Sequence, residues 1–434
     1  MKGTSRRALR GLILATAATA FVLATAHSRP SGDPPVDRRQ TAGPALSTPA
    51  VADEPVTYGG VAYGARRSPT RDKPQSKLWY QDGAWWALMI APDEQFRVFE
   101  LQVDQAWRDT GVVVDERPHS TADALWDGSE LHVVSRTSGG EVRFLSLTYL
   151  PEARSYQVQP GFPIVLYEDG ATSVAMTEDS TGLLWATFQQ GSRVFVTHST
   201  TASGDAWVVP STPLAKESVV TNDDISSVIS FDGRVGLMWS NQRTGAFYFT
   251  SHVDGTPDTQ WTPVEVPLQG EGMADGHVAL AAPSEGSPQT GSLYAGVKTS
   301  LDDIAASPST APLVLVLERS PDGRWTQHVV GTVEDSMTRP VLLLEEDAGL
   351  LHVFTTSPMR GGRIHQRSSA TEDMRWVSGL GRSFIAATGA VLNDATSTKQ
   401  SVNVASGIVV LASDTAQHRY YHTTLLAERA AADG

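Results

Sequence analysis

The side chains that could carry chemistry occur at a fixed place in a repeated unit. The unit contains a turn with glycines at positions 83, 128, 182, 233, 286, 349 and 407. Eight residues before each turn acid, or before Ser406 in the last unit, stand Pro74, His119, Ala171, Asp224, His277, Arg339 and Thr398. Four of these seven are His, Asp or Arg, which transfer protons or bind anions. The repeat therefore predicts one shared site to which several units contribute.

Two of these positions suit acid/base chemistry. His277 and Asp224 combine an imidazole with a carboxylate, and they are the catalytic candidates if the protein cleaves glycosidic bonds by hydrolysis or elimination. His119, Asp224 and His277 are also metal-ligand types, but they come from three units and lack the short spacing of a ligand motif. The sequence therefore predicts no metal and no cofactor, and leaves open whether the protein is a glycosidase, a polysaccharide lyase or no enzyme.

Cations gather at the same level of the repeat. The chain has six lysines against 28 arginines, yet Lys73, Lys298 and Lys399 all fall at or near these positions. The segment Lys73-Pro74-Gln75-Ser76 also resembles Thr398-Lys399-Gln400-Ser401. If the first and last units are neighbours in space, two ammonium groups would lie beside Arg339 and form a pocket for a carboxylate or sulfate.

Further polar side chains complete the predicted site. The amides suited to reading hydroxyl groups are Gln75, Gln400, Asn241 and Gln242. The full set of predicted ligand-binding residues is Lys73, Gln75, His119, Asp123, Asn241, Gln242, Lys298, Arg339, Lys399 and Gln400. The alternative interpretation is a polar channel that only holds ordered water.

The repeat itself predicts how these residues are brought together. Successive turn glycines lie 45 to 63 residues apart, and apolar runs rich in Val, Ile, Phe, Tyr and Trp alternate with Gly and Asp turns. This pattern is typical of a four-stranded propeller blade, so we expect an all-β, seven-bladed propeller over residues 56–427. The last unit stops after three strands, and Val56–Ala65 is expected to supply its outer strand and close the ring.

Five tryptophans follow an acid at the third turn of a unit, namely Trp107, Trp207, Trp261, Trp325 and Trp376. We expect them to pack between blades. These turns resemble the Asp-box (BNR-type) repeat of sialidase-like propellers, Ser-x-Asp-x-Gly-x-x-Trp, and Ser320 to Trp325 comes closest although it is one residue short. The resemblance implies the fold alone, since such boxes lie away from the active site in that family. A true sialidase also needs a Phe-Arg-Ile-Pro start, which is missing, so that family's catalytic residues are not carried over.

The composition and the two ends of the chain limit the kinds of partner that we expect. Residues 1–26 carry four cations, no acid and an apolar run ending in Ala24-Thr25-Ala26, which predicts a secretory signal peptide, either general or twin-arginine, and either cleaved or kept as an anchor. Residues 27–55 form a predicted disordered linker and 428–434 a tail. The net charge of -14 disfavours nucleic acid and membrane surfaces as partners. We expect a monomer in the extracellular space or cell envelope.

Together these features predict an exported propeller that binds an extracellular carbohydrate, neutral or acidic, in its central funnel. Lys73, Lys399 and Arg339 would hold an anionic group on that ligand. The competing hypothesis is a non-catalytic envelope scaffold that contacts other proteins through its outer faces, because a fold does not determine a function.

Overall fold

Strands are the main secondary structure of the described chain, which in this computed structural model comprises residues 55–64, 67–137, 139–210 and 216–425. The predicted signal peptide of residues 1–26, the tail of 428–434 and the 27–55 linker except Pro55 lie outside the described residues. Helical structure in the described ranges is limited to four 3₁₀ turns, at Pro151–Ala153, Lys216–Ser218, Leu301–Asp303 and Val333–Asp335. None of these helices is long and apolar enough to cross a membrane.

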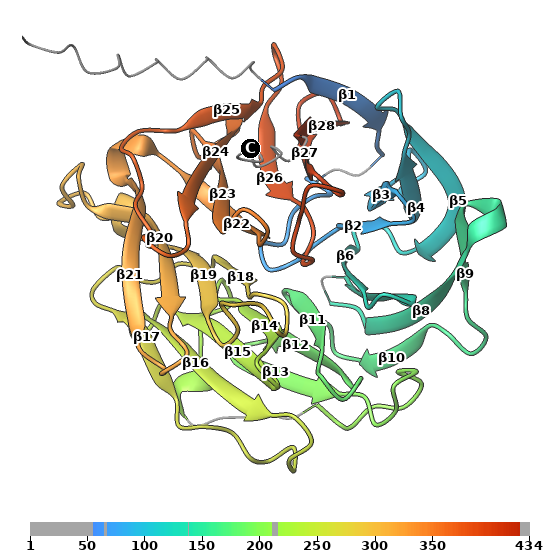
Figure 1. Cartoon of the computed structure of the whole chain (residues 1–434), viewed down its shortest axis with the longest axis horizontal. Helices are drawn as coiled ribbons and strands as arrows, with labels where there is room; N and C mark the ends of the chain where they lie inside the picture. Colours follow the sequence, from blue (N-terminus) through green and yellow to red (C-terminus); the bar gives the residue numbers. More distant parts are fainter. Residues whose placement is uncertain (1–54, 65–66, 138, 211–215, 426–434) are drawn as a thin grey trace, which may run out of the picture. The chain divides into compact units, whose positions relative to one another are not determined.

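Seven antiparallel sheets follow one another along the chain and stand around a central axis as a β-propeller (Figure 1). From the innermost strand outward, blade 1 comprises β2 (Leu78–Gln81), β3 (Ala84–Ile90), β4 (Phe96–Leu101) and β5 (Trp107–Asp115); blade 2 comprises β6 (Thr121–Trp126), β7 (Glu130–Arg136), β8 (Val142–Leu150) and β10 (Ile164–Tyr167); blade 3 comprises β11 (Val174–Glu178), β12 (Leu184–Gln190) and β13 (Arg193–His198). Blade 4 comprises β14 (Ser226–Phe231), β15 (Arg234–Asn241), β16 (Ala246–Val253) and β17 (Glu265–Gln269); blade 5 comprises β18 (Val278–Ala281), β19 (Leu293–Lys298), β20 (Pro312–Arg319) and β21 (Trp325–Thr332). Blade 6 comprises β22 (Thr338–Glu345), β23 (Leu350–Ser357), β24 (Arg363–Ala370) and β25 (Arg382–Ile385); blade 7 comprises β26 (Leu392–Thr396), β27 (Ile408–Asp414), β28 (Arg419–Leu425) and β1 (Thr57–Ala62). The predicted all-β, seven-bladed fold is confirmed.

Two blades depart from the regular four strands. In blade 2 the outer edge of β8 is shared by β10 and a short additional strand, β9 (Ser155–Val158). Blade 3 has three strands, and isolated bridges through Trp207 and Val219 stand where a fourth strand would pair. Both departures lie at the outer edge, so the innermost strands keep their regular places around the axis.

The second strand of each blade shows why the sheets pack face to face. Every residue of β3 is buried, because neighbouring blades cover both faces of this strand. Trp86 on β3, for example, makes an edge-on contact with Tyr156 of blade 2, with ring centroids 5.2 Å apart. The hairpin that begins this strand turns at Gly83, whose positive φ of 71° favours glycine.

Strand β1 closes the ring, as the sequence predicts. It pairs antiparallel with β28, and it is the outermost strand of a sheet whose other members come from the far end of the chain. Gly60 in β1 packs closely against Trp107 of blade 1, so that a Cβ at this position would lie 3.3 Å from the indole ring. Tyr420 of β28 completes the junction, because its hydroxyl accepts a 2.7 Å hydrogen bond from the Ile90 backbone N–H of blade 1.

The chain must then travel from the outer edge of blade 7 to the innermost strand of blade 1. The segment from Arg67 to Lys77 makes the second half of this crossing. It is held against blade 7 by the hydroxyls of Ser68 and Thr70, each 2.7 Å from the Ser413 hydroxyl. This crossing segment is the part of the fold that brings Arg71, Lys73 and their neighbours to the central axis.

Three of the five tryptophans that follow a third-turn acid are seen to brace neighbouring blades, as predicted. Trp107 donates a hydrogen bond to His422 of blade 7 over 3.2 Å. Trp207 contacts Phe144 of blade 2, and Trp325 contacts Phe249 of blade 4. Each of these three indoles therefore reaches the preceding blade of the ring.

We predict that deletion of Thr57–Ala62 destabilises the whole propeller cooperatively. The deletion exposes the edge of β28 and removes contacts that join blades 7 and 1, and domain stability is only about 5–15 kcal/mol. Thermal unfolding followed by circular dichroism should show a single transition at much lower temperature. The control is Val56→Ser, which changes an exposed residue just before β1 and should leave the transition in place. An unchanged transition in the deletion variant would refute closure by β1.

Candidate functional site

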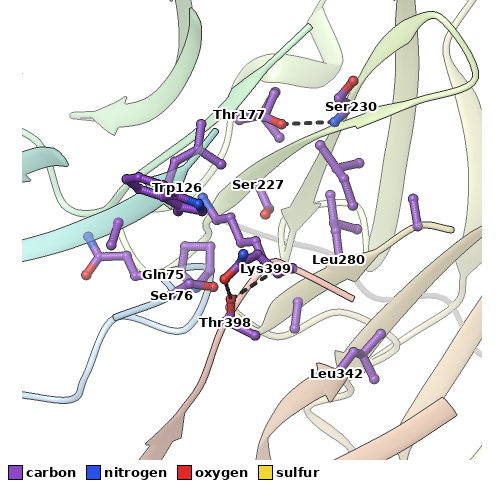
Figure 2. Close-up of a pocket in the computed structure, with 18 of the residues that line it drawn as sticks. Gln75, Ser76, Trp126, Thr177, Ser227, Ser230, Leu280, Leu342, Thr398 and Lys399 are labelled. Carbon is purple, nitrogen blue, oxygen red and sulfur yellow. Dashed lines mark hydrogen bonds between the residues drawn. The ribbon is translucent and has the colours of Figure 1, made fainter. Parts of the chain in front are cut away.

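A central channel runs between the innermost strands and holds a cavity of about 300 Å³. All seven blades contribute to its wall, with polar residues Lys73, Gln75, Ser76, Asp127, Thr177, Glu178, Ser227, Ser230, Thr398, Lys399 and Gln400 and apolar residues that include Trp126, Leu280 and Leu342. Figure 2 shows Gln75 and Ser76 of the crossing segment close to Thr398 and Lys399, which follow the innermost strand of blade 7. The two similar sequence segments therefore meet inside this channel.

Lys399 reaches across the channel to an acid of another blade. Its ammonium donates hydrogen bonds to Asp123 Oδ2 and to the Met176 carbonyl, and in Figure 2 its side chain extends away from blade 7. Asp123 is completely buried, and it also accepts backbone N–H bonds from Ser76 at 2.7 Å and Met176 at 2.8 Å. This ion pair ties blades 1, 2, 3 and 7 together, and it neutralises the charge of Lys399.

The two glutamines of these segments bond to the protein itself. Gln75 donates to the Val174 carbonyl at 3.0 Å and accepts from the fully buried Lys77, whose pKa is lowered by burial to about 8. Gln400 Oε1 accepts from the Tyr80 backbone N–H at 2.8 Å. Both glutamines line the channel wall while their amides hold neighbouring strands in register.

Trp126 and Glu178 are channel residues that the sequence analysis missed. Trp126 offers an aromatic ring, and burial, followed by the nearby charge of Asp127, raises the pKa of Glu178 to about 7. Each stands directly before a turn acid, Asp127 or Asp179. The same turn offset, shortened from eight residues to one, would have identified both.

A second cavity of about 500 Å³ forms the mouth of the channel, where the innermost strands begin. Its lining cations are Arg67, Arg71, Lys73, Arg136 and Arg339, its acids are Asp72, Asp223, Asp224 and Asp394, and its neutral polar residues are Ser68, Thr172, Ser173, Asn222, Asn393 and Thr415. These residues come from the crossing segment and from blades 2, 3, 4, 6 and 7. Lys73 also lines the channel, so the two cavities adjoin at its side chain.

Arg339 stands in the mouth in a fixed orientation. Its Nε donates to Asp394 Oδ1 at 2.5 Å, and its backbone has a positive φ of 56°, which interrupts the pairing of β22 with β23. Asp394 has a similar φ of 53° at an irregularity of β26. Two bulged inner strands therefore present a paired guanidinium and carboxylate to the same cavity.

Lys73 and Lys399 do not both lie beside Arg339. Lys73 lines the mouth together with Arg339, whereas Lys399 lines the deeper channel. The reason is local, because the innermost strand of blade 7 ends at Thr396 and the next residues continue downward along the channel. Burial lowers the pKa of Lys73, and the acids Asp275 and Asp223 oppose that effect.

Asp224 lines the mouth, but its carboxylate accepts hydrogen bonds from neighbouring residues of the protein. It accepts hydrogen bonds from Thr221 N at 2.7 Å, Ser240 Oγ at 2.9 Å and Gln242 N at 3.0 Å. Asn241 likewise donates to the carbonyls of Glu217 and Val219, both at 3.0 Å. These contacts position the loops of blade 4, and they leave the neighbouring Asp223 exposed at the mouth.

His277 lies in a buried charged cluster under the mouth. Its Nδ1 is 3.2 Å from Asp275 Oδ1, and its Nε2 is 3.3 Å from the Thr338 hydroxyl. Lys298 donates to Asp275 at 2.7 Å and to Asp302 at 2.8 Å. Burial and the positive charge of Lys73 lower the pKa of His277 to about 3, so the imidazole is neutral at pH 7. The two predicted acid/base residues thus occupy separate hydrogen-bond networks.

The remaining predicted residues lie at the edge of the site. His119 is exposed and lines a hollow beside the mouth, next to Arg117 and Arg136. Gln242 donates to Asp223 Oδ2 over 3.3 Å. In the part of the chain that the structure describes, no group of three or more His, Asp or Glu side chains is placed to hold a metal ion.

Comparisons with known proteins return structural likenesses only. No family model and no curated protein sequence matches the chain. Among solved structures, the polysaccharide lyase Uly1 is similar at 10% identity and a TM-score of 0.47, covering 87% of this chain and 98% of the lyase. An α-L-arabinanase from Penicillium chrysogenum has 9% identity and a TM-score of 0.45, covering 74% and 100%. The Aleuria aurantia fucose lectin has 11% identity and a TM-score of 0.38, covering 58% and 76%. At these values the likeness carries no information on what this chain binds.

We predict that Lys399→Met destabilises the protein by about 3–5 kcal/mol, because it leaves the buried Asp123 carboxylate without its cation. The double variant Asp123→Asn/Lys399→Met removes both charges and should recover much of this loss. Urea denaturation of the two variants and the wild-type protein measures the difference. A loss below about 1 kcal/mol in the single variant would contradict the ion pair as a structural element.

We also predict that His277 makes stability depend on pH. Its folded pKa of about 3 lies below the ordinary value of about 6.5, so the unfolded chain binds the proton more readily. The contribution is therefore fully present above pH 6.5 and is lost as the pH falls toward 3. His277→Gln should flatten the decrease of the urea midpoint between pH 7 and pH 5. An equally steep decrease in the variant would show that His277 is not buried in its neutral form.

Proposed function

We propose that the protein binds a carbohydrate at the mouth of its central channel. The observation that carries this proposal is the mouth cavity, which presents donors and acceptors from six parts of the ring within about 500 Å³. Binding sites for small ligands are typically about 300–1,000 Å³ in volume and have a few fixed polar groups. A polyhydroxylated ligand suits this lining, because each hydroxyl group can both donate and accept a hydrogen bond.

Ion pairs within the protein fix the orientation of polar side chains in the mouth without a ligand. Arg339 is oriented by Asp394, and Arg136 is oriented by Asp72. Asp72 also accepts from the Thr121 hydroxyl at 2.6 Å, and although burial opposes ionisation, Arg136 and Arg71 lower its pKa. A preorganised site loses less side-chain entropy on binding than a flexible one.

The channel below the mouth offers a complementary surface. Trp126 supplies an aromatic ring, and hydroxyls of Ser227, Ser230 and Thr177 line the same wall (Figure 2). Thr177 already accepts from the Ser230 backbone N–H at 3.0 Å. A sugar unit entering from the mouth would meet an apolar face and several hydroxyls there, which suits its own mixed surface.

The scaffold hypothesis receives less support from the surface. The exposed large hydrophobic residues of the described chain are single valines and one leucine distributed over all seven blades. Isolated apolar residues of this kind are normal on a soluble protein, whereas a protein-binding face usually gathers them into one patch. Export by the segment of residues 1–26 remains part of this proposal.

We predict that a binding glycan found by thermal-shift and calorimetric screening of the purified protein requires the mouth residues. Arg339→Gln and Asn222→Ala should each weaken its binding, by about tenfold for the arginine, because charged hydrogen bonds are the stronger ones. Asn222 is exposed, so its substitution tests the site without disturbing an ion pair.

The matched control is Arg375→Gln, which removes a guanidinium that is 82% exposed at a turn of the same blade 6. It should bind the glycan like the wild-type protein. A screen of neutral and acidic glycans without any binding ligand would contradict the proposal, as would binding that both mouth variants leave unchanged.

A further inference from the structure

A strongly basic hollow adjoins the mouth on the side of blade 2. This basic pocket has a volume of about 540 Å³ and is lined by Arg67, Arg71, Arg117, Pro118, His119, Arg136 and Thr137. None of these lining residues is acidic, although the chain carries a net charge of -14. The four guanidinium groups around this cavity therefore make the local charge positive, opposite in sign to the net charge of the protein.

The guanidinium groups that line the basic pocket outnumber the carboxylates that form ion pairs with them. Arg71 and Arg136 share one carboxylate, Asp72, and Arg117 pairs with Asp115. Four guanidinium groups thus face two carboxylates. Asp115 is 1% exposed and lines neither cavity, while Asp72 lines the mouth rather than the basic pocket. Arg67, Arg71 and Arg136 also line the mouth, where the aspartates lie, whereas the basic pocket has no acidic lining residue.

Two of the arginines form a rigid wall. Arg117 donates to both oxygens of Asp115, to the Glu141 carbonyl at 2.7 Å and to the Ser135 hydroxyl at 3.1 Å. Arg136 is buried, and its Nε has no hydrogen-bond partner among the described atoms. Such an unsatisfied buried donor is costly, and a site that holds one often serves a ligand or an ordered water.

The other two arginines are available for binding. Arg71 makes one 3.3 Å bond through Nε to Asp72, and its side chain is 31% exposed. Arg67 is exposed, and no bond joins it to another described residue. A planar guanidinium of this kind can bind both oxygens of a carboxylate or sulfate at once. His119 adds an exposed imidazole at the same rim.

We propose that the basic pocket binds the carboxylate or sulfate of an acidic oligosaccharide whose neighbouring sugar unit lies in the mouth. This inference rests on the proposed carbohydrate function and specifies its ligand class. The two cavities share Arg67, Arg71 and Arg136, so one chain of sugars can occupy both without leaving the surface. A cavity of about 540 Å³ also exceeds what an inorganic anion would fill, which favours an anionic group attached to a larger molecule.

The test is calorimetry at low ionic strength with three tetrasaccharides: a galacturonic acid tetramer, a sulfated galactose tetramer and an unmodified galactose tetramer. We expect at least one acidic tetramer to bind about tenfold or more tightly than the neutral one. The tetramer that shows this preference identifies carboxylate or sulfate as the recognised group. Added salt should weaken the preference, because the basic pocket is partly exposed.

The decisive variant is Arg67→Gln/Arg71→Gln, which removes the two available guanidinium groups and at most one weak hydrogen bond. It should reduce acidic binding to the level of the neutral tetramer. The matched control is Arg324→Gln, which removes an equally charged side chain that is 76% exposed on blade 5 and should keep the preference.

The outcomes separate the two proposals. If the neutral tetramer binds as tightly as the acidic ones, or if the double variant keeps the preference, the basic pocket inference is wrong while the carbohydrate function stands. If no tetramer binds, the proposed function is contradicted, and calorimetry with inorganic sulfate decides the inference. Sulfate binding that the double variant abolishes supports an anion site, and its absence overturns one.

Discussion

The ring of blades is closed by the pairing of β1 with β28. A propeller blade buries both faces against its neighbours, so a ring with a gap would leave two blades uncovered and one sheet edge unpaired. Blade 7 receives its outer strand from the opposite end of the described chain, which joins the first and last units by backbone hydrogen bonds. Contacts such as that of Tyr420 with Ile90 then seal blade 7 against blade 1.

This closure also creates the candidate site. Because β1 is outermost in blade 7 and β2 is innermost in blade 1, the chain between them has to cross the face of the ring. The crossing segment brings Arg67, Arg71 and Lys73 to the mouth and Gln75 into the channel. Each blade-to-blade junction runs from an outer strand to the next innermost strand, but the crossing segment supplies more of the charged residues of the mouth than the other connections do.

Charge pairing explains how a polar site persists inside an acidic protein. Asp123 with Lys399, Asp394 with Arg339 and Asp72 with Arg136 each join residues from different parts of the ring. Burying such ions is unfavourable unless partners compensate them, so each pair requires its two segments to lie in one arrangement. The pairs therefore hold the inner strands in register, and the basic pocket differs from them in having more guanidinium groups than carboxylates.

The ring could be predicted from the amino-acid sequence, because a repeat of strands and turns depends on local preferences and on the period of the chain. The sequence predicted seven blades, closure by the first strand and tryptophans that brace neighbouring blades. It also predicted one shared level for Arg339 and Asp224 from their constant distance to a turn, and both residues line the mouth. The roles assigned to the individual site residues remain predictions.

Which polar residues meet could not be predicted, because it depends on how the chain folds around the ring. Lys399 lies past the end of the inner strand of blade 7 and reaches Asp123 in the channel instead of lying beside Arg339. Arg136 ends a second strand, and its partner Asp72 is 64 residues away in the crossing segment. Long-range ion pairs and the sharing of one cavity depend on how irregular segments cross the ring, and such placement leaves no periodic signal in the sequence.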